Sequence, residues 1–266
     1  MFNYIVNVHN SEKHLNYVLE GVLKCKGLFS KVYVVLDGCT DDSEVVAKKY
    51  PVTILKTPDI RETLAINYAL DYLKNTGAKY NIILQDDVVI IDTDIEQKLI
   101  NLYAKYPNTG VIGFRHGTNL DPECLTNGKI IPDTDIIQNQ NNSQVGDYPM
   151  LGDGEMAYRH IVYKSPICIP KAVYDVLGGY DERFAPIYHE DAEYGIRAWQ
   201  AGFKNIVLGL RIYQPREWSG CARFEGKMRA LDPIQAEHME LLRKLYPEQI
   251  KQMILDVPSK EIIQLW

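Results

Sequence analysis

Short apolar runs alternate with helical periods through the first half of the chain, and this alternation limits the fold more than any other feature. Strand-like apolar runs cover residues 4 to 8, 32 to 36, 51 to 58 and 81 to 85. Between them, apolar residues recur at helical spacing in residues 12 to 25, 41 to 50 and 63 to 74. Strands that alternate with helices form parallel sheets with helices on both faces. We therefore predict an α/β fold with a mainly parallel central sheet.

The second half of the chain has a less regular pattern. Strand-like pieces return at residues 167 to 169 and 206 to 208, and residues 192 to 201 have a helical pattern that Gly202 ends. The segment from residue 120 to 147 is rich in Asn, Asp, Gln, Pro and Gly. Polar segments of this length without periodicity are usually functional loops or mobile lids, so we predict a functional loop or a lid there.

The chain is predicted to be one large domain with a helical tail. Residues 1 to 230 form the predicted domain, with residues 1 to 115 as one half and residues 116 to 230 as the other. Residues 231 to 266 form the predicted C-terminal helical extension, which Pro247 and Pro258 interrupt.

Composition excludes several classes of partner. The 266 residues carry a formal net charge of −6, which is the opposite of the basic excess expected in a nucleic-acid-binding protein. The five cysteines form no CxxC pair, so neither a zinc cluster nor a disulfide framework is predicted. We see no signal peptide and no apolar run of membrane-spanning length. We expect a cytoplasmic protein with reduced thiols, and peripheral membrane association stays open.

Two adjacent acids, Asp86 and Asp87, interrupt the apolar run NIILQDDVVIID. An ionised carboxylate away from water is costly unless it has a partner. Neighbouring side chains of a regular strand point to opposite faces, so we predict that the strand ends at Gln85 and turns through both acids. Two interpretations stay open: a solvated surface turn, or a site for a divalent cation shared with a diphosphate.

Polar residues follow the other predicted strands as well. Ligands of open parallel sheets bind beyond the carboxyl ends of the strands, so these positions are candidate binding residues. Asp37, in VVLDGCTDDS, can accept hydrogen bonds from a base or from ribose hydroxyls. Its alternative role is to cap the turn and the helix that follows.

A third polar group lies in GGYDERFAPIYHEDAEYGIRAWQAGF, residues 178 to 203. Gly178 and Gly179 permit a close approach of the backbone. Glu190 and Asp191 open a predicted helix, where the helix dipole favours carboxylates for structural reasons alone. The functional alternative is a general base that takes a proton from an attacking hydroxyl.

Together, these segments resemble the family 2 glycosyltransferases, which have a GT-A-type fold. YIVNVHNSEKHL is similar to the first strand and its Asn-containing turn, and VVLDGCTDDS is similar to the nucleotide-binding segment. ILQDDV resembles the acidic metal-binding motif, usually Asp-x-Asp. GGYDERF and HEDAEYGIRAWQAGF resemble the acceptor-side segment and the base motif. The resemblance covers residues 1 to 215 and implies a single Rossmann-like domain.

The resemblance implies an inverting transfer of a sugar from a nucleoside-diphosphate sugar to an acceptor hydroxyl, in glycan or polysaccharide assembly. Asp191 would be the catalytic base, and Asp87 would bind Mn²⁺ or Mg²⁺, which neutralises charge on the leaving diphosphate. The implied donor-binding residues are Val8, His9, Asn10, Asp37, Arg61 and Asp86. The implied acceptor-side residues are Gly179, Tyr180, Asp181 and Glu190. The expected partners are a UDP-sugar, with GDP or dTDP as alternatives, and a glycan or glycolipid acceptor.

The chain departs from the family pattern at three points. Gln85 stands where the first Asp of the acidic motif is common, and Leu36 replaces an acidic neighbour of Asp37. RIYQPREWSG, residues 211 to 220, lacks the histidine that many relatives use as a metal ligand. The missing groups keep open an inactive, glycosyltransferase-like binding or scaffold protein. A nucleotidyltransferase is less favoured, because VNVHNSEKH contains no glycine for a phosphate loop.

Overall fold

The computed structural model describes residues 1–126, 135–139, 148–215, 218 and 232–266. Most of the predicted lid at residues 120 to 147, and the predicted boundary at residue 230, lie outside these residues. The predicted halves of the domain remain predictions.

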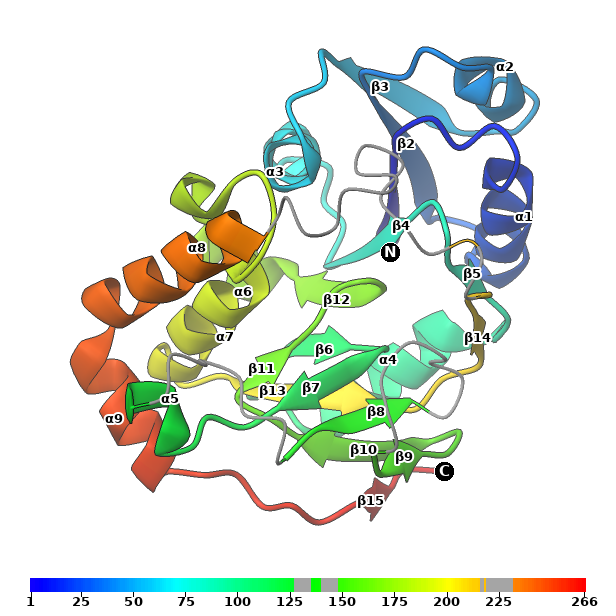
Figure 1. Ribbon diagram of the computed structural model, residues 1–266. Coiled ribbons are helices and arrows are strands. Elements are labelled where there is room, and N and C mark those ends of the chain that lie inside the picture. Colours follow the sequence, from blue (N-terminus) through cyan, green and yellow to red (C-terminus); the bar gives the residue numbers. More distant parts are fainter. Residues whose placement is uncertain (127–134, 140–147, 216–217, 219–231) are drawn as a thin grey trace.

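Within the described residues, a nine-stranded sheet forms the centre of the molecule (Figure 1), in the order β15-β10-β13-β6-β12-β4-β1-β2-β3. β1 pairs in parallel with β2 and β4, β2 with β3, and β13 with β6, whereas β12 is antiparallel to β4 and β6. The mainly parallel sheet predicted from the sequence is therefore confirmed. The strands are β1 (Phe2–Val8), β2 (Lys31–Asp37), β3 (Thr53–Thr57), β4 (Tyr80–Gln85), β6 (Thr109–Gly113), β10 (Glu155–Tyr158), β12 (Ile167–Pro170), β13 (Lys204–Leu208) and β15 (Ile263–Gln264).

Helices cover both faces of this sheet, because its strands have apolar side chains on both sides. Residues of α1 (Leu15–Cys25), α2 (Ser43–Ala47) and α4 (Ile95–Lys105) share one core with Tyr4 and Val6 of β1. Residues of α3 (Glu62–Leu73), α6 (Lys171–Leu177) and α7 (Glu190–Gln200) share a second core with Ile5. Successive side chains of β1 point to opposite faces of the sheet, so these two sets of helices lie on opposite faces.

Smaller sheets lie beside the central one. β11 (Ile161–Val162), β7 (His116–Thr118), β8 (Ile137–Asn139) and β9 (Met150–Leu151) form a second sheet in that order. β5 (Val89–Ile90) pairs with β14 (Ile212–Tyr213). The short elements α5 (Glu123–Thr126) and the 3-10 helix η1 (Glu182–Phe184) complete this half. β4 ends at Gln85 and a turn carries Asp86 and Asp87, as predicted.

The predicted elements differ from the structure at two places. The helix predicted over residues 41 to 50 is shorter in the structure, where α2 covers only Ser43–Ala47. Pro51 contributes to this, because the residue before a proline is disfavoured in a helix. The tail forms α8 (Asp232–Leu245) and α9 (Pro247–Leu255), but its end is the strand β15, which pairs with β10. The end of the tail is held there by packing of the Trp266 indole against Gly154. The two residues are so close that a Cβ added to Gly154 would lie 2.6 Å from Trp266 Nε1.

None of the helices in the described part of the chain is both long enough and apolar enough to span a membrane.

Asn205 of β13 joins three parts of the core, which gives a test of the fold. Its side chain is fully buried, accepts a hydrogen bond from the Val111 amide, and donates to the carbonyls of His160 and Gly195. Asn205→Leu leaves these buried groups without partners, so we expect the free energy of unfolding to fall by about 2–4 kcal/mol. Asn101→Leu, at an exposed position in α4, is the control. Equal urea-denaturation curves for both variants would contradict this account of the core.

Candidate active site

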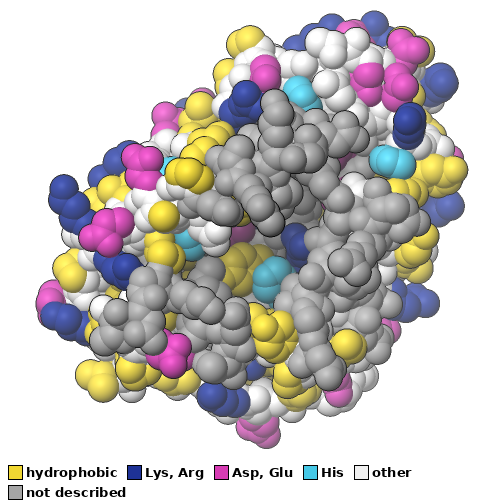
Figure 2. Space-filling model, viewed as in Figure 1, with side chains coloured by type: hydrophobic (Ala, Val, Ile, Leu, Met, Phe, Trp, Pro, Cys, Tyr) yellow, Lys and Arg dark blue, Asp and Glu magenta, His cyan; other side chains and the backbone are white. Residues whose placement is uncertain are grey.

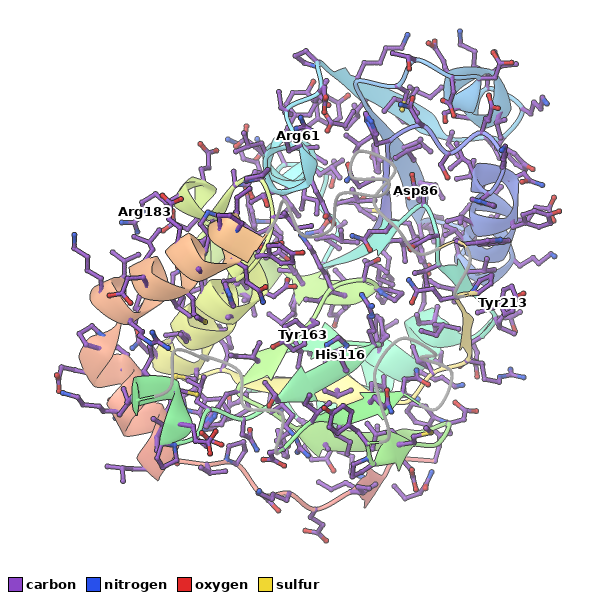
Figure 3. All side chains as sticks on the ribbon, viewed as in Figure 1. Arg61, Asp86, His116, Tyr163, Arg183 and Tyr213 are labelled. Carbon is purple, nitrogen blue, oxygen red and sulfur yellow. The ribbon has the colours of Figure 1, made fainter. Side chains whose placement is uncertain are left out.

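The loops that follow β1, β2 and β4 meet at the carboxyl edge of the sheet, where Figure 3 shows Asp86 at the end of β4. The His9 amide donates to Asp86 Oδ2 at 3.0 Å. Asn10 Oδ1 accepts hydrogen bonds from the amides of Thr40 and Asp41, at 2.7 and 3.3 Å. Val8 is fully buried in the core, so its side chain does not face this edge. Parallel pairing therefore brings together most of the residues that the sequence predicted as donor-binding.

Asp37 has a structural role at this edge. Its carboxylate is fully buried and accepts hydrogen bonds from Thr57 Oγ1 at 2.7 Å and from the amides of Ile60 and Arg61 at 2.8 and 3.0 Å. These bonds hold the loop that leads into α3, where Arg61 has a positive φ of 77°. Asp37 thereby places Arg61 at the rim of the site (Figure 3). A direct contact from Asp37 to a base stays a prediction.

Asp86 and Asp87 are half-buried, and burial raises the pKa of both carboxyl groups. The pKa of Asp86 rises to about 7, with the negative charge of Asp87 as the second cause. Asp87 Oδ2 accepts a hydrogen bond from Gln214 Nε2 at 3.1 Å, which opposes the increase. Asp87 Oδ1 is buried and has no hydrogen-bond partner among the described residues.

This acidic turn fits a hard divalent cation only as part of a shared site. Carboxylate oxygens are suitable ligands, and the buried Oδ1 of Asp87 lacks a partner within the described residues. Over those same residues, however, no three His, Cys, Asp or Glu side chains gather as a metal-binding group. Mg²⁺ and similar ions accept one or two carboxylates when substrate phosphates and water complete the shell. Asp86 and Asp87 match that arrangement.

A buried hydrogen-bonded network connects the acidic turn with α7. Gln85 Nε2 donates to Glu62 Oε1 at 2.5 Å, and the Lys164 ammonium lies 3.3 Å from the same oxygen. Lys164 Nζ also forms an ion pair with Glu190 Oε1. The exposed fractions of the Glu62, Lys164 and Glu190 side chains are only 9%, 6% and 2%. Neither Glu62 nor Lys164 lies in a recognisable motif, so neither is predicted from the sequence to have a role in the site.

Asp191 lies at the first turn of α7, next to this network. The backbone amide of Lys164 donates to its Oδ2 at 3.2 Å, while Oδ1 is buried and has no hydrogen-bond partner in the described part of the chain. Burial raises the pKa of Asp191 to about 7; the positive charge of Lys164 opposes this and the negative charge of Glu190 adds to it. A carboxyl group with such a pKa can accept a proton near neutral pH.

Arg115, between β6 and β7, joins the two acidic groups electrostatically. Its guanidinium interacts with the carboxylates of Asp87, Asp191 and Glu62, while burial lowers its own pKa. Neither Arg115 nor Gln214 is among the site residues predicted from the sequence. An isolated arginine or glutamine in an irregular segment carries no pattern, so only the fold reveals these contacts.

The acceptor-side residues divide into two groups. Asn67 of α3 accepts from the Tyr180 amide and donates to its carbonyl, both at 2.8 Å, and a Cβ on Gly179 would lie 2.5 Å from Asn67 Oδ1. Gly179 and Tyr180 are thereby held beside the network, with Lys164 Nζ 5.7 Å from the Tyr180 ring centroid. Asp181 instead pairs with the exposed Arg183, which Figure 3 shows on the outside of the molecule. The structure therefore does not bring Asp181 into the cluster.

One face of the molecule is hollowed, and a histidine and hydrophobic side chains are visible in the hollow (Figure 2). Figure 3 places His116 and Tyr163 in this region, where their rings stack with centroids 4.3 Å apart. Burial, with the neighbouring Arg115 charge, lowers the pKa of His116 to about 3, so the imidazole is neutral. The pair adds a flat, uncharged surface near the acidic cluster.

The raised pKa values of Asp86 and Asp191 predict a pH dependence of stability. Both groups ordinarily titrate near 3.8 and titrate near 7 in the folded protein, so the folded state binds more protons between these values. Their contribution therefore makes the ligand-free protein less stable as pH rises from about 4 to about 7, by about 1.4 kcal/mol per unit of pKa shift. In urea titrations over this range, Asp191→Asn should lose less stability than the wild type. Exposed Glu182→Gln is the control, and parallel profiles for all three proteins would disprove the assignment.

Comparison with solved structures shows the same fold in a larger protein. The Staphylococcus aureus TarS structure matches with a TM-score of 0.55 and 16% identity, over 92% of this chain and 42% of that one. TarS residues 1–349 in complex with UDP give a TM-score of 0.58 at 16% identity, over 91% and 69% of the two chains. The complex with UDP-GlcNAc gives a TM-score of 0.58 at 14% identity, over 93% and 72%. The chain thus spans less than half of the first of these TarS structures.

No curated protein sequence gives a significant match. The family model described as glycosyl transferase family 2 matches residues 4–160, which is more than half of the chain and includes the acidic turn. This match and the fold confirm the resemblance seen in the sequence: the protein is a glycosyltransferase and belongs to glycosyl transferase family 2.

Proposed function

We propose that the protein is an inverting, metal-dependent glycosyltransferase that moves a sugar from a nucleoside-diphosphate sugar to a hydroxyl group of a glycan or glycolipid. A UDP-sugar is the favoured donor, because structures with the same fold contain UDP and UDP-GlcNAc. Residues 1 to 115 would bind the donor and residues 116 to 230 the acceptor. The proposal includes a cytoplasmic reaction in glycan or polysaccharide assembly.

The state of Asp191 is the observation that supports this reaction most directly. One carboxylate oxygen is fixed by the Lys164 amide, and the other is buried without a hydrogen-bond partner in the described residues. Its pKa of about 7 makes it a base of suitable strength for neutral pH. A structural carboxylate at a helix start would instead be solvated or capped, with a low pKa.

In the proposed reaction, Asp191 accepts the proton of the acceptor hydroxyl as that oxygen attacks the anomeric carbon. The bond from the anomeric carbon to the diphosphate oxygen breaks, and the nucleoside diphosphate leaves with the bonding electrons. Attack and departure occur on opposite sides of the carbon, so its configuration inverts. Lys164 and Glu190 keep Asp191 fixed, and burial excludes water that would compete with the acceptor.

The donor would lie along the carboxyl edge of the sheet. His9 and Asn10 lie in the loop after β1 and Arg61 lies in the loop after β3, and the acidic turn follows β4 at the same edge. Asp87, with Asp86 beside it, would hold Mn²⁺ or Mg²⁺; such an ion neutralises negative charge on a leaving diphosphate. Glu190 is placed by its ion pair with Lys164, so we assign it to positioning of the base.

Asp191→Asn tests the base. The variant keeps the size of the side chain but cannot accept the proton, so we expect kcat to fall by about 10²–10⁴-fold. Nucleotide affinity should change little, because Asp191 is predicted to act on the acceptor. Activity would be followed as release of the nucleoside diphosphate from UDP-sugars, and binding by calorimetry. Glu182→Gln serves as the surface control, and a fully active Asp191→Asn protein would remove this residue from the role.

Asp87→Ala tests the metal. We expect UDP affinity measured with Mn²⁺ to fall about tenfold or more, which is about 1.4 kcal/mol. Without Mn²⁺, wild type and variant should bind UDP equally weakly. Asp94→Ala, which removes a mostly exposed acid with a side-chain exposure of 60%, is the matched control. If Mn²⁺ has no effect on UDP binding by the wild type, the acidic turn is a solvated turn and not a metal site.

A further inference from the structure

The turn that leads into α7 has a backbone conformation that its residues do not favour. Tyr188 and His189 have φ values of 79° and 65°, in the left-handed region where residues other than glycine are uncommon. Such a conformation is strained and persists only when surrounding contacts enforce it. The His189 carbonyl accepts the first helical hydrogen bond, from Glu193, at 2.9 Å. The turn therefore sets where α7, and Asp191 with it, begins.

His238 of α8 holds this turn from the C-terminal side of the chain. Its Nδ1 donates to the Tyr188 carbonyl at 3.0 Å, which fixes the tautomer as the one protonated at Nδ1. The imidazole is 5% exposed, and its edge packs against Phe184 of η1 with ring centroids 5.4 Å apart. The bond is partly buried, so losing its donor would remove a directional contact that holds the carbonyl of this turn.

The rest of the tail anchors α8 and α9 on α7, and Figure 1 shows the three helices side by side. Tyr246 OH donates to Glu193 Oε1 at 2.6 Å. Leu242 and Met253 of the tail share a hydrophobic cluster with Ile196 of α7. Apolar packing thus attaches the helices, while His238 supplies a directional contact at the turn. The tail lies beyond residues 4–160, which the family model matches.

We propose that His238 is a positioning residue for the transfer reaction, acting through the Tyr188 carbonyl to keep the Tyr188–His189 turn, and hence Asp191, in the reactive arrangement. His238 touches neither substrate nor the reacting atoms in this proposal. Through His238, α8 then contributes to the reactive arrangement of the site. The inference rests on the proposed role of Asp191 as the base.

Three variants separate positioning from packing. His238→Phe keeps a buried ring but removes the donor. His238→Asn keeps an amide N–H near the position of Nδ1, so it is the conservative rescue. Met253→Ala deletes a side chain that is 1% exposed in the same tail and has no hydrogen bond to the turn, so it is the control for loss of stability.

We expect kcat of His238→Phe to fall about ten- to a hundredfold, as small displacements of a catalytic group do. UDP affinity and the KM for the donor should stay within about twofold of the wild type, because the donor edge lies elsewhere. His238→Asn should recover most of kcat. Met253→Ala should lower the melting temperature yet keep the kcat of the wild type, when assayed well below that temperature.

The outcomes distinguish this inference from the function on which it rests. An inactive Asp191→Asn protein together with a fully active His238→Phe protein overturns the role of His238 and leaves the base intact. An active Asp191→Asn protein overturns the proposed function whatever the His238 variants do. Equal loss of kcat in His238→Phe, His238→Asn and Met253→Ala would reduce the tail to a purely structural role. If His238→Phe does not fold, His238→Gln replaces it, because its amide lies one carbon farther out and should also lose kcat.

Discussion

The buried ammonium of Lys164 is the interaction on which the arrangement of this site depends. It lies between Glu62, at the start of α3, and Glu190, at the start of α7, and so joins helices that follow different strands. Taking these charges out of water is costly, and a single missing partner would leave an uncompensated buried charge. The two acids raise the pKa of Lys164 despite its burial, so the ammonium stays charged. The same residue fixes Asp191 through its backbone amide.

This network also explains why Gln85 is compatible with the site although the family pattern favours an acid there. Gln85 donates to Glu62 at 2.5 Å, so a carboxylate at position 85 would face a second carboxylate at contact distance. The cluster already holds Asp86, Asp87 and Asp191 besides the two acids bound to Lys164. A neutral donor limits this excess of negative charge, and Glu62 supplies the carboxylate from another strand connection. The missing acid at position 85 is therefore a local departure from the family pattern, and Glu62 compensates for it.

The parts of the structure that the sequence predicted are those with local causes. Apolar periodicity located the strands, and parallel pairing then brought the polar residues at their carboxyl ends together. The bonds that complete the site join residues far apart in the chain: Lys164 reaches back to Glu62, and Gln214 reaches Asp87. In the sequence alone, a lysine or a glutamine at such a position cannot be distinguished from one at the surface. β15 was missed for the same reason, because its place depends on how Trp266 packs on Gly154.

Electrostatics couples the two ends of the site. Arg115 interacts with both Asp87 and Asp191, so the charge state near one acid changes the field at the other. A divalent cation at Asp87 would add positive charge on that side of Arg115 and favour the ionised form of Asp191. A larger fraction of Asp191 would then be ionised, and so able to accept a proton, when the donor and its metal are bound than when the site is empty.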